Sequence, residues 1–214
     1  MIRALIFDLD NCLAAADEPG ESLLEPAFAA IRAANHGTLS EAALQHAFAD
    51  CWRHPLDWVA STHGFTSGML KAGWDVMANT VVTQPMHGYG DLEVLASLPA
   101  ERFLVTSGFT RLQSSKIARL RLDRFFAEMY VDAIDEPNRL GKQKLFERIM
   151  DRHGLRPTEV LVVGDNADSE IEAGNRLGIQ TVQTLRPGVT KAQTATFHVK
   201  GLEELAQKLI EDRR

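Results

Sequence analysis

The segment FDLDNCLA, residues 7–14, places two aspartates, Asp8 and Asp10, directly after a short apolar run. That run, residues 2–6, is apolar except for Arg3 and has the composition of a buried strand. Carboxylates grouped at the end of a buried strand raise one another's pKa unless a cation neutralises their charge. The pair therefore predicts a functional site at the carboxyl end of the first strand.

Six β-rich runs recur along the chain and alternate with stretches that have helical spacing of apolar residues. The predicted strands are residues 2–10, 102–108, 128–133, 159–165, 179–184 and 196–199. The predicted helices between and after them are residues 110–121, 142–153 and 201–212. Strands that alternate with helices indicate a parallel sheet covered on both faces. The predicted fold class is therefore α/β, with a doubly wound, Rossmann-like parallel sheet.

Residues 14–90 interrupt this alternation, because they contain one helix-like pattern after another and no convincing strand. Ser40 has the position of an N-cap, with Leu39 and Leu44 spaced to form a hydrophobic staple. We predict an all-helical cap domain at 14–90, inserted after the first strand. The core domain would then consist of residues 1–13 and 91–214.

Side chains of the cap offer few clear ligands. Four aromatic residues could stack on a substrate: Trp52, Trp58, Phe65 and Trp74. Aromatic residues at helical spacing more often form the core of a small helical domain, and we favour that interpretation. Arg53 and His54 are interpreted as solvated residues of a helix face.

Bulk composition limits the classes of partner. The 214 residues are 45% hydrophobic and 24% charged, which is typical of a globular protein with a sizeable core. The net charge of -6 gives no indication of a nucleic-acid polymer or an anionic membrane surface as partner. Cys12 and Cys51 lack metal-ligand spacing and favour a reducing, cytoplasmic location. No run approaches the ~18 apolar residues of a membrane span. We expect the protein to be a monomer or a homodimer.

Polar residues also follow two later strands: Thr106 and Ser107 after FLV, and Asp165 after LVVG. The carboxyl ends of neighbouring parallel strands converge on one crevice, so these residues and the two aspartates should form one site. A hard divalent cation with oxygen ligands, for which we favour Mg²⁺, would neutralise the acidic cluster and leave room for a phosphate. The cluster therefore predicts a metal.

The residue types fit phosphoryl transfer. Side chains at i and i+2 of a strand share a side, so one of Asp8 and Asp10 could be the nucleophile and the other a general acid and then base. Thr106 and Ser107 offer a hydroxyl and backbone N–H donors to phosphoryl oxygens. Lys142 is the favoured cation, while Lys144, on the same helix, is interpreted as a surface residue.

Taken singly, these signals are weak. A lone DxD is more often a loop, a cap or part of a calcium loop, and VGD is usually a strand-to-turn junction. The calcium-loop interpretation fails because Cys12 and Leu13 stand where an oxygen ligand and a glycine are needed. The three motifs in this order, each closing a hydrophobic strand, favour a shared site.

With these motifs the sequence resembles the haloacid dehalogenase (HAD) superfamily of phosphohydrolases. The resemblance covers residues 1–13 and about 91–200, and 14–90 matches the position of that family's C1-type cap. FDLDNCLA resembles the first motif, FLVTSG the second, Lys142 the third and VVGDNADSEIEAG the fourth.

The resemblance implies a role for each matching residue. Asp8 would be the nucleophile that forms an aspartyl-phosphate, and Asp10 the acid and base. Mg²⁺ would bind Asp8, the Asp10 backbone carbonyl and Asp165. The implied phosphate-binding set is Leu9, Asp10, Thr106, Ser107 and Lys142.

Two departures from the family pattern are visible. Asn11-Cys12 replaces a common Gly-Thr and is similar to the pyrimidine 5'-nucleotidase-like members. Ser169-Glu170 replaces a common Asn-Asp. This suggests that Glu170 contacts the metal through a water molecule or supports its direct ligands, together with Ser169.

The resemblance implies a Mg²⁺-dependent phosphatase acting on a small phosphorylated metabolite of the nucleotide, sugar phosphate or phosphoglycolate type. One alternative is a non-catalytic protein of the same fold that binds or senses a phosphorylated ligand. Another is a phosphomutase, although the segment EPGES, residues 18–22, lacks the cap histidine that such mutases carry there.

Overall fold

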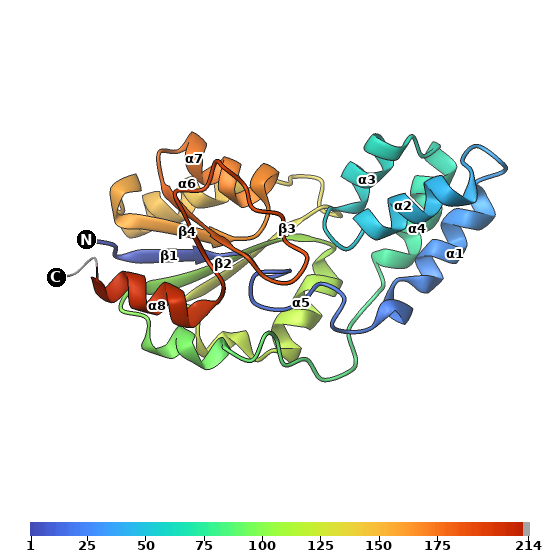
Figure 1. The fold of residues 1–214 in the computed structure, drawn as a ribbon. Helices are drawn as coiled ribbons and strands as arrows, with labels where there is room; N and C mark the ends of the chain where they lie inside the picture. Colours follow the sequence, from blue (N-terminus) through green and yellow to red (C-terminus); the bar gives the residue numbers. More distant parts are fainter. Residues whose placement is uncertain (212–214) are drawn as a thin grey trace.

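The computed structural model describes residues 1–211 and has a six-stranded parallel sheet at its centre (Figure 1). The strands are β1 (Ala4–Phe7), β2 (Glu101–Gly108), β3 (Glu128–Ala133), β4 (Val160–Gly164), β5 (Gln180–Thr184) and β6 (Phe197–Val199). Their order is β3-β2-β1-β4-β5-β6, and every pairing is parallel. This is the strand order of a doubly wound sheet, so the predicted fold class is confirmed.

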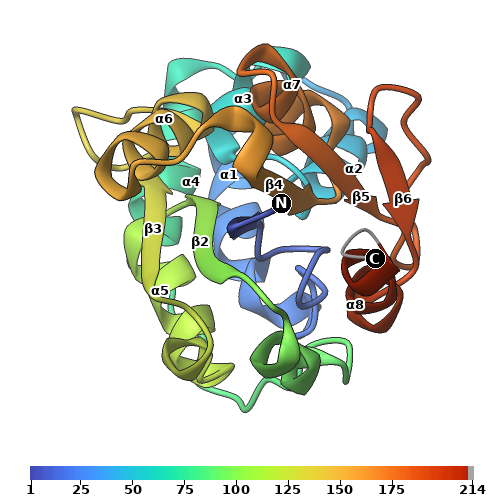
Figure 2. The ribbon, with the colours of Figure 1, turned by 90° about the vertical axis from the view of Figure 1, so that its left-hand side faces the viewer.

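Helices cover both faces of the sheet. Helices α6 (Lys142–His153) and α7 (Glu172–Arg176) lie on one face, and α5 (Thr110–Arg119) and α8 (Leu202–Glu211) lie on the other (Figure 2). Strand β1 is buried on both sides: Leu5 and Phe7 join the core beneath α5 and α8, whereas Ala4 and Ile6 join the core beneath α6. The short turns η2 (Leu92–Ser97), η3 (Leu122–Arg124), η4 (Pro157–Glu159) and the π-helical η5 (Ala167–Ile171) complete this part.

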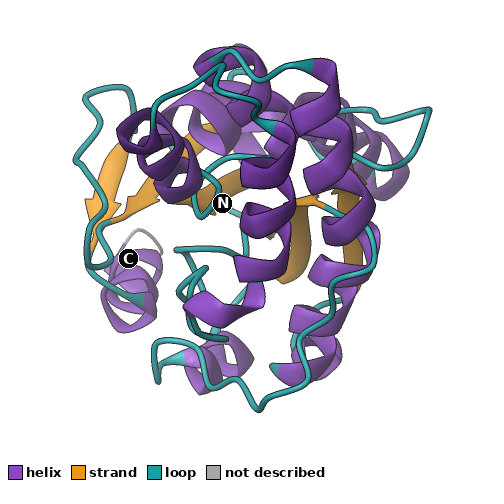
Figure 3. Cartoon of the chain, turned by 90° about the vertical axis from the view of Figure 1, so that its right-hand side faces the viewer, coloured by secondary structure: helices purple, strands orange, loops and turns teal. Residues whose placement is uncertain are grey.

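Four helices form a separate group beyond the carboxyl edge of the sheet (Figures 1 and 3). They are α1 (Glu25–Ala34), α2 (Glu41–Asp50), α3 (Leu56–His63) and α4 (Ser67–Met77), preceded by the turn η1 (Glu21–Leu23). We call these four helices the cap. The Ser40 hydroxyl accepts the N–H of Ala43 at 3.2 Å, which confirms the predicted N-cap. The domain limits of 14–90 stay a prediction.

The structure corrects the prediction for the first strand, which ends at Phe7 instead of at residue 10. Beyond Phe7 the chain turns, because the Leu9 carbonyl accepts the N–H groups of Cys12, Leu13 and Ala14. Asp8 and Asp10 therefore do not lie side by side along a strand. Among residues 1–211, no helix combines the length and apolarity needed to cross a membrane.

Candidate active site

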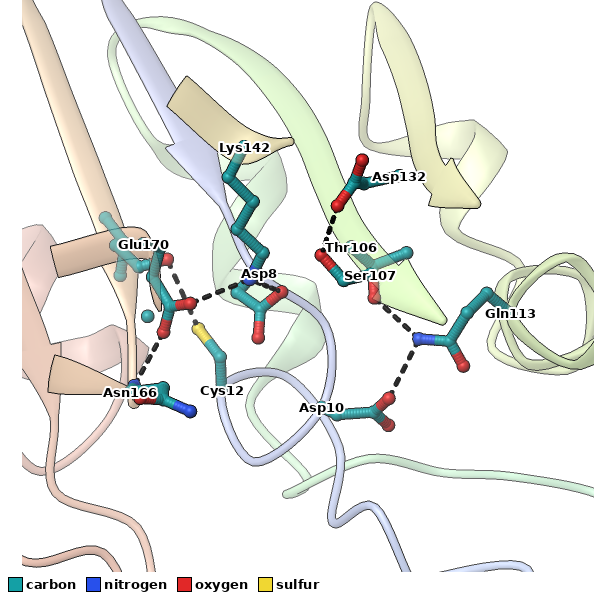
Figure 4. Close-up of polar contacts among 12 residues, drawn as sticks. Asp8, Asp10, Cys12, Thr106, Ser107, Gln113, Asp132, Lys142, Asn166 and Glu170 are labelled. Carbon is teal, nitrogen blue, oxygen red and sulfur yellow. Dashed lines mark hydrogen bonds and ion pairs between the residues drawn. The ribbon is translucent and has the colours of Figure 1, made fainter. Parts of the chain in front are cut away.

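Asp8 is the first residue after the central strand β1, and a buried lysine holds its carboxylate. Lys142 Nζ donates to Asp8 Oδ1 and to Glu170 Oε2, each at 2.7 Å (Figure 4). The Lys142, Asp8 and Glu170 side chains are only 8%, 8% and 1% exposed. Lys144 is exposed. The structure thus brings together Asp8 and the lysine that the sequence favours.

Helix α6 delivers Lys142 to this point because its first residue is anchored from two directions. Phe146 and Ile149 bury the inner face of the helix in the core beneath it. The preceding Gly141 has φ 81°, a conformation that favours glycine, and its N–H donates to Asp132 Oδ1 at 2.8 Å. The helix start is therefore fixed relative to the end of β3.

Glu170 reaches the site through a π-helical turn. Its Oε1 accepts the Asn166 N–H at 2.6 Å. A Cβ added to Gly164 would lie 2.3 Å from Glu170 Cγ, so only glycine leaves room for this side chain. Carboxylate oxygens of Asp8, Asp165 and Glu170 lie within 4.8 Å of one another. The sequence suggests a more remote role for Glu170, but the structure brings its carboxylate into the acidic group.

Burial gives this acidic group unusual electrostatics. Burial above all, with the charge of Glu170 added and that of Lys142 opposing, raises the pKa of Asp8 to about 7. Burial and then the charges of Glu170 and Asp8 raise the pKa of Asp165 to about 9. Burial alone would lower the pKa of Lys142, but the two carboxylates raise it. A single lysine faces three acids, and the group is short of positive charge.

Asp10 belongs to a different set of contacts and lies outside the acidic group. Lys116 Nζ contacts Asp10 Oδ1 at 2.6 Å, and Gln113 Nε2 donates to Asp10 Oδ2 at 2.9 Å. Asn11, the next residue, has φ 56°. Asparagine tolerates this left-handed conformation better than most residues, so the replacement of the family's common glycine keeps the turn.

Thr106 and Ser107, at the end of β2, use their hydroxyls differently. The Thr106 hydroxyl accepts a hydrogen bond from Gln113 Nε2 at 2.6 Å, which leaves its own proton free for another acceptor. The Ser107 hydroxyl donates to Asp132 Oδ2 at 3.1 Å. The Thr106 hydroxyl is therefore oriented toward the site, while the Ser107 hydroxyl is bonded to Asp132 near the end of β3.

The turn after Asp8 exposes backbone donors. Leu9 has a fully buried side chain, so only its backbone can serve a ligand. The N–H groups of Leu9 and Asp10 donate to no acceptor within residues 1–211. Ser169 lines the same cavity, and its hydroxyl makes no hydrogen bond within the described chain. Two adjacent free N–H groups beside a carboxylate suit an anionic oxygen.

Gln113 and Lys116 are site residues that the sequence analysis missed. Both lie on α5 with the buried Leu112, and both are themselves buried. Polar side chains three residues apart on the apolar face of a helix are unexpected unless something binds them. That pattern was visible in the sequence and could have identified them.

A cavity of about 470 Å³ connects these residues to the cap. Asp8, Thr106 and Lys142 lie on its core side, and Trp52, Trp58 and Met77 are among the residues on its cap side. Trp58 is 43% exposed, so its predicted place in the core of the cap is wrong.

The cap is joined to the core by polar contacts around the cavity. Arg53 donates to the Gly188 carbonyl at 2.8 Å. On the cap side itself, His54 stacks on Trp58 with ring centroids 3.8 Å apart. Arg53 and His54 both lie in the turn between α2 and α3, which corrects their assignment to a helix. Arg53 is exposed, as predicted, whereas His54 is partly buried. Arg139 bridges Asp132 of the core, at 2.9 Å, and Asp57 of α3, at 2.8 Å.

Comparison with known proteins places the chain in a family. The model of the haloacid dehalogenase-like hydrolase family matches residues 2–178. Glyceraldehyde 3-phosphate phosphatase of Methanopyrus kandleri is 35% identical over 85 residues, which are 38% of this chain and 35% of that protein. The pyrimidine 5'-nucleotidase PynA of Streptococcus pneumoniae is 25% identical over 103 residues, 46% of this chain and 42% of that protein.

The matches span less than half of these two curated relatives. Among solved structures, the HAD-family protein YfnB of Bacillus subtilis, bound to magnesium, has a TM-score of 0.62 at 17% identity, covering 97% of this chain and 98% of that one. This likeness supports the fold, and the family model covers most of the chain. The chain belongs to the haloacid dehalogenase-like hydrolase family.

Proposed function

We propose that the chain is a Mg²⁺-dependent phosphatase that hydrolyses a small phosphorylated metabolite through a phosphoryl group carried on Asp8. The observation that carries this proposal is the buried group of Asp8, Asp165 and Glu170, in which Lys142 contacts two of the three acids. The group lies at the carboxyl edge of the sheet, where open α/β folds bind ligands. Membership of a hydrolase family with phosphatases among its relatives supports the same activity.

The donor set suits a hard divalent cation. The carboxylates of Asp8, Asp165 and Glu170 would hold it, because Mg²⁺ prefers carboxylate oxygens and the group lacks positive charge. The Asp10 backbone carbonyl stays a predicted further ligand. The magnesium bound to YfnB supports this choice of metal. When bound, the ion would neutralise charge on the carboxylates and on the phosphoryl oxygens.

The two aspartates divide the chemistry. Asp8 Oδ2 accepts no hydrogen bond from residues 1–211, since Lys142 contacts Oδ1. In the first step Oδ2 bonds to phosphorus, the bond from phosphorus to the leaving oxygen breaks, and Asp10 gives that oxygen a proton. In the second step water bonds to phosphorus, Asp10 takes its proton, and Asp8 leaves as a carboxylate. One phosphate ester and one water thus give an alcohol and inorganic phosphate.

Other groups of this chain would hold the transferring phosphoryl group. The Thr106 hydroxyl can donate to one phosphoryl oxygen, because Gln113 already occupies it as an acceptor. The free N–H groups of Leu9 and Asp10 can donate to others, and the Lys142 ammonium neutralises charge nearby. Positioning and charge neutralisation of this kind are the main requirements of phosphoryl transfer.

The substrate is proposed to be a small molecule held between the cap and the sheet. A cavity of about 470 Å³ falls within the usual range for small-molecule sites. The names of the two relatives suggest a range from a triose phosphate to a pyrimidine nucleotide. Trp52 and Trp58, on the cap side, offer flat surfaces for the part of the substrate that is not phosphate.

Release of inorganic phosphate from a panel of phosphorylated metabolites, with Mg²⁺ and with EDTA, tests this proposal. We expect Mg²⁺-dependent release by the wild-type protein and none by Asp8→Asn. A protein that binds phosphorylated ligands without turnover would instead give ligand-induced stabilisation and no phosphate. Phosphate release that Asp8→Asn retains would contradict the mechanism.

A further inference from the structure

We propose that Lys116 and Gln113 are positioning residues that hold the Asp10 carboxylate in the orientation needed for proton transfer. The inference rests on the proposed function, because it assigns a role within that reaction. It also has a structural content of its own: Asp10 should change its orientation when these two donors are removed.

The contacts fix both oxygens of one carboxylate. Lys116 Nζ lies 2.6 Å from Asp10 Oδ1, and Gln113 Nε2 lies 2.9 Å from Oδ2. The two donors are three residues apart on α5 and therefore share a helix face. Two donors on one rigid element leave the carboxylate little rotational freedom.

The donors also fix the turn that carries Asp10. Lys116 Nζ lies 3.4 Å from the Ala16 carbonyl, and the Asn11 side chain accepts the Ala16 N–H at 3.1 Å. Backbone bonds close the same turn, since the Asn11 N–H donates to the Ala14 carbonyl at 2.6 Å. Lys116 thus touches both the start and the end of the turn.

Gln113 ties this arrangement to the phosphate-binding side of the site. The same Nε2 group that donates to Asp10 Oδ2 also donates to the Thr106 hydroxyl at 2.6 Å (Figure 4). One amide therefore sets the position of the proton carrier relative to the residue proposed to bind the phosphoryl group. Asp8, by contrast, receives no contact from either donor.

Burial explains why a lysine serves here. The Lys116 side chain is 5% exposed and the Asp10 side chain 23% exposed. A buried ammonium needs oxygen partners, and the Asp10 carboxyl group and the Ala16 carbonyl supply them. The partly open Asp10 still contacts the cavity, where the leaving oxygen and the attacking water would lie.

Dependence on the leaving group separates positioning from a general structural role. An alkyl phosphate needs a proton on its leaving oxygen, whereas p-nitrophenyl phosphate releases a stable anion and needs little help. We expect Lys116→Met to lower kcat/KM for glycerol phosphate by about 10- to 100-fold, as a displaced group does. The loss for p-nitrophenyl phosphate should be several-fold smaller, and Lys116→Arg should recover part of the alkyl activity.

A double-mutant cycle tests whether the lysine acts through Asp10. We expect Lys116→Met to have little further effect in an Asp10→Asn background, because the group that it orients is already disabled. Gln113→Met should follow the same pattern. Lys144→Met, which removes an exposed lysine, is the matched control and should leave both substrates unaffected.

A crystal structure of the Lys116→Met, Gln113→Met variant gives a readout independent of turnover, and we expect the Asp10 carboxylate to have rotated. If Lys116→Met does not fold, Lys116→Arg and Gln113→Met alone carry the kinetic test. The inference is overturned by an unmoved Asp10, by equal losses on both substrates, or by a full additional loss in Asp10→Asn. A wild-type protein without phosphatase activity would overturn the proposed function, and the crystal structure would still decide the position of Asp10.

Discussion

The two aspartates of FDLDNCLA are two residues apart in sequence but lie in two differently built regions of the site. Asp8 shares a buried lysine with Glu170 at the centre of the sheet. Asp10 is held from α5, beside the cavity, and its side chain is more exposed than that of Asp8, at 23% against 8%. The turn after Phe7 separates the two regions.

The difference matches two different chemical tasks. A nucleophile needs its charge balanced and one oxygen free, which the region around Asp8 provides. A group that gives and then takes a proton needs orientation and access to water, which the region around Asp10 provides. Each region can therefore be disabled separately, and the consequences should differ in size and in kind.

The largest effect is expected from removing the nucleophile. Asp8→Asn should lower kcat by at least about 10⁴-fold, because an amide cannot attack phosphorus as the carboxylate does, and the neighbouring Asp165 and Glu170 are proposed to hold the metal. Phosphate release measured by a colorimetric assay checks this. Asp151→Asn, an exposed acid on α6, is the control and should keep full activity. Substantial turnover by Asp8→Asn would show that another residue is the nucleophile.

The next effect concerns the other region. Asp10→Asn should lower kcat/KM for an alkyl phosphate by roughly 10² to 10⁴-fold, since an amide can neither donate a carboxyl proton nor accept one. Asp10→Asn should lower kcat/KM less for p-nitrophenyl phosphate, because the leaving group of this substrate needs little help from a proton in the first step. Equal rates for mutant and wild type on the alkyl substrate would show that Asp10 is not the acid or base of the reaction.

Removing the cation of the Asp8 region should affect both activity and folding. Lys142→Met should lower kcat by about 10² to 10³-fold, as does loss of one charge-stabilising group. It should also lower the free energy of unfolding by about 3–5 kcal/mol, because Asp8 and Glu170 lose their partner in a buried place.

Urea denaturation at two pH values sharpens this prediction. Without Lys142 the buried acids are tolerated only when protonated, so the destabilisation should grow as the pH rises. Lys144→Met, on the same helix, should show neither loss. A stability loss that is the same at both pH values would indicate lost packing instead of unpaired charge.

The sequence predicted one of these regions better than the other. The parallel sheet and the shared edge of Asp8 and Asp165 follow from apolar runs that end in polar residues, a pattern that is visible in the sequence. Lys142 follows from the apolar face of its own helix. The contacts of Asp10 depend on where β1 ends and on the face that α5 presents. Apolar periodicity does not fix a strand end to within a residue, and Lys116 lies more than a hundred positions away in the chain.

Glu170 and Trp58 illustrate what else escaped sequence reasoning. The approach of Glu170 depends on a π-helical turn and on the missing side chain of Gly164, neither of which a propensity argument detects. Trp58 has the spacing of a core residue, but the cap has a second surface that faces the cavity. Residues that line a cavity between two packed groups look like core residues in sequence.

Metal binding offers a smaller effect that is confined to the acidic group. A carboxyl whose folded-state pKa is raised destabilises the fold as the pH rises from its ordinary value to the raised one. For Asp8 this window runs from 3.8 to about 7, and for Asp165 from 3.8 to about 9. Mg²⁺ should relieve this destabilisation, so it should raise the Tm more at about pH 8.5 than at about pH 5.

Differential scanning fluorimetry with and without MgCl₂ measures this shift. Asp165→Asn removes one of the two raised carboxyls and should reduce the dependence of the Mg²⁺ effect on pH. Asp10→Asn changes a residue outside the acidic group and should leave most of the pH dependence of the Mg²⁺ effect. A Tm increase of the same size at both pH values would contradict the idea that Mg²⁺ competes with protons for these carboxylates.

The smallest expected effect concerns the cap, which contacts the core near Asp132 through Arg139. The Arg139–Asp57 pair has side chains 31% and 41% exposed, and an exposed pair contributes about 0.2–1 kcal/mol. If it favours the closed cap, Asp57→Ala should raise KM by less than about 5-fold and leave kcat nearly unchanged, because Arg139 keeps its bond to Asp132.

Steady-state kinetics at low and high ionic strength distinguishes this weak electrostatic contact from a direct role in binding. The difference between Asp57→Ala and wild type should fade at high salt, since exposed charges are screened. Asp75→Ala, which breaks an exposed pair with Lys71 inside the cap, should change KM at neither salt level. A large fall in kcat for Asp57→Ala would mean that the cap, through Arg139 and Asp132, helps to fix the helix start that carries Lys142. The two regions would then share a support that the contacts of Asp8 and Asp10 alone do not reveal.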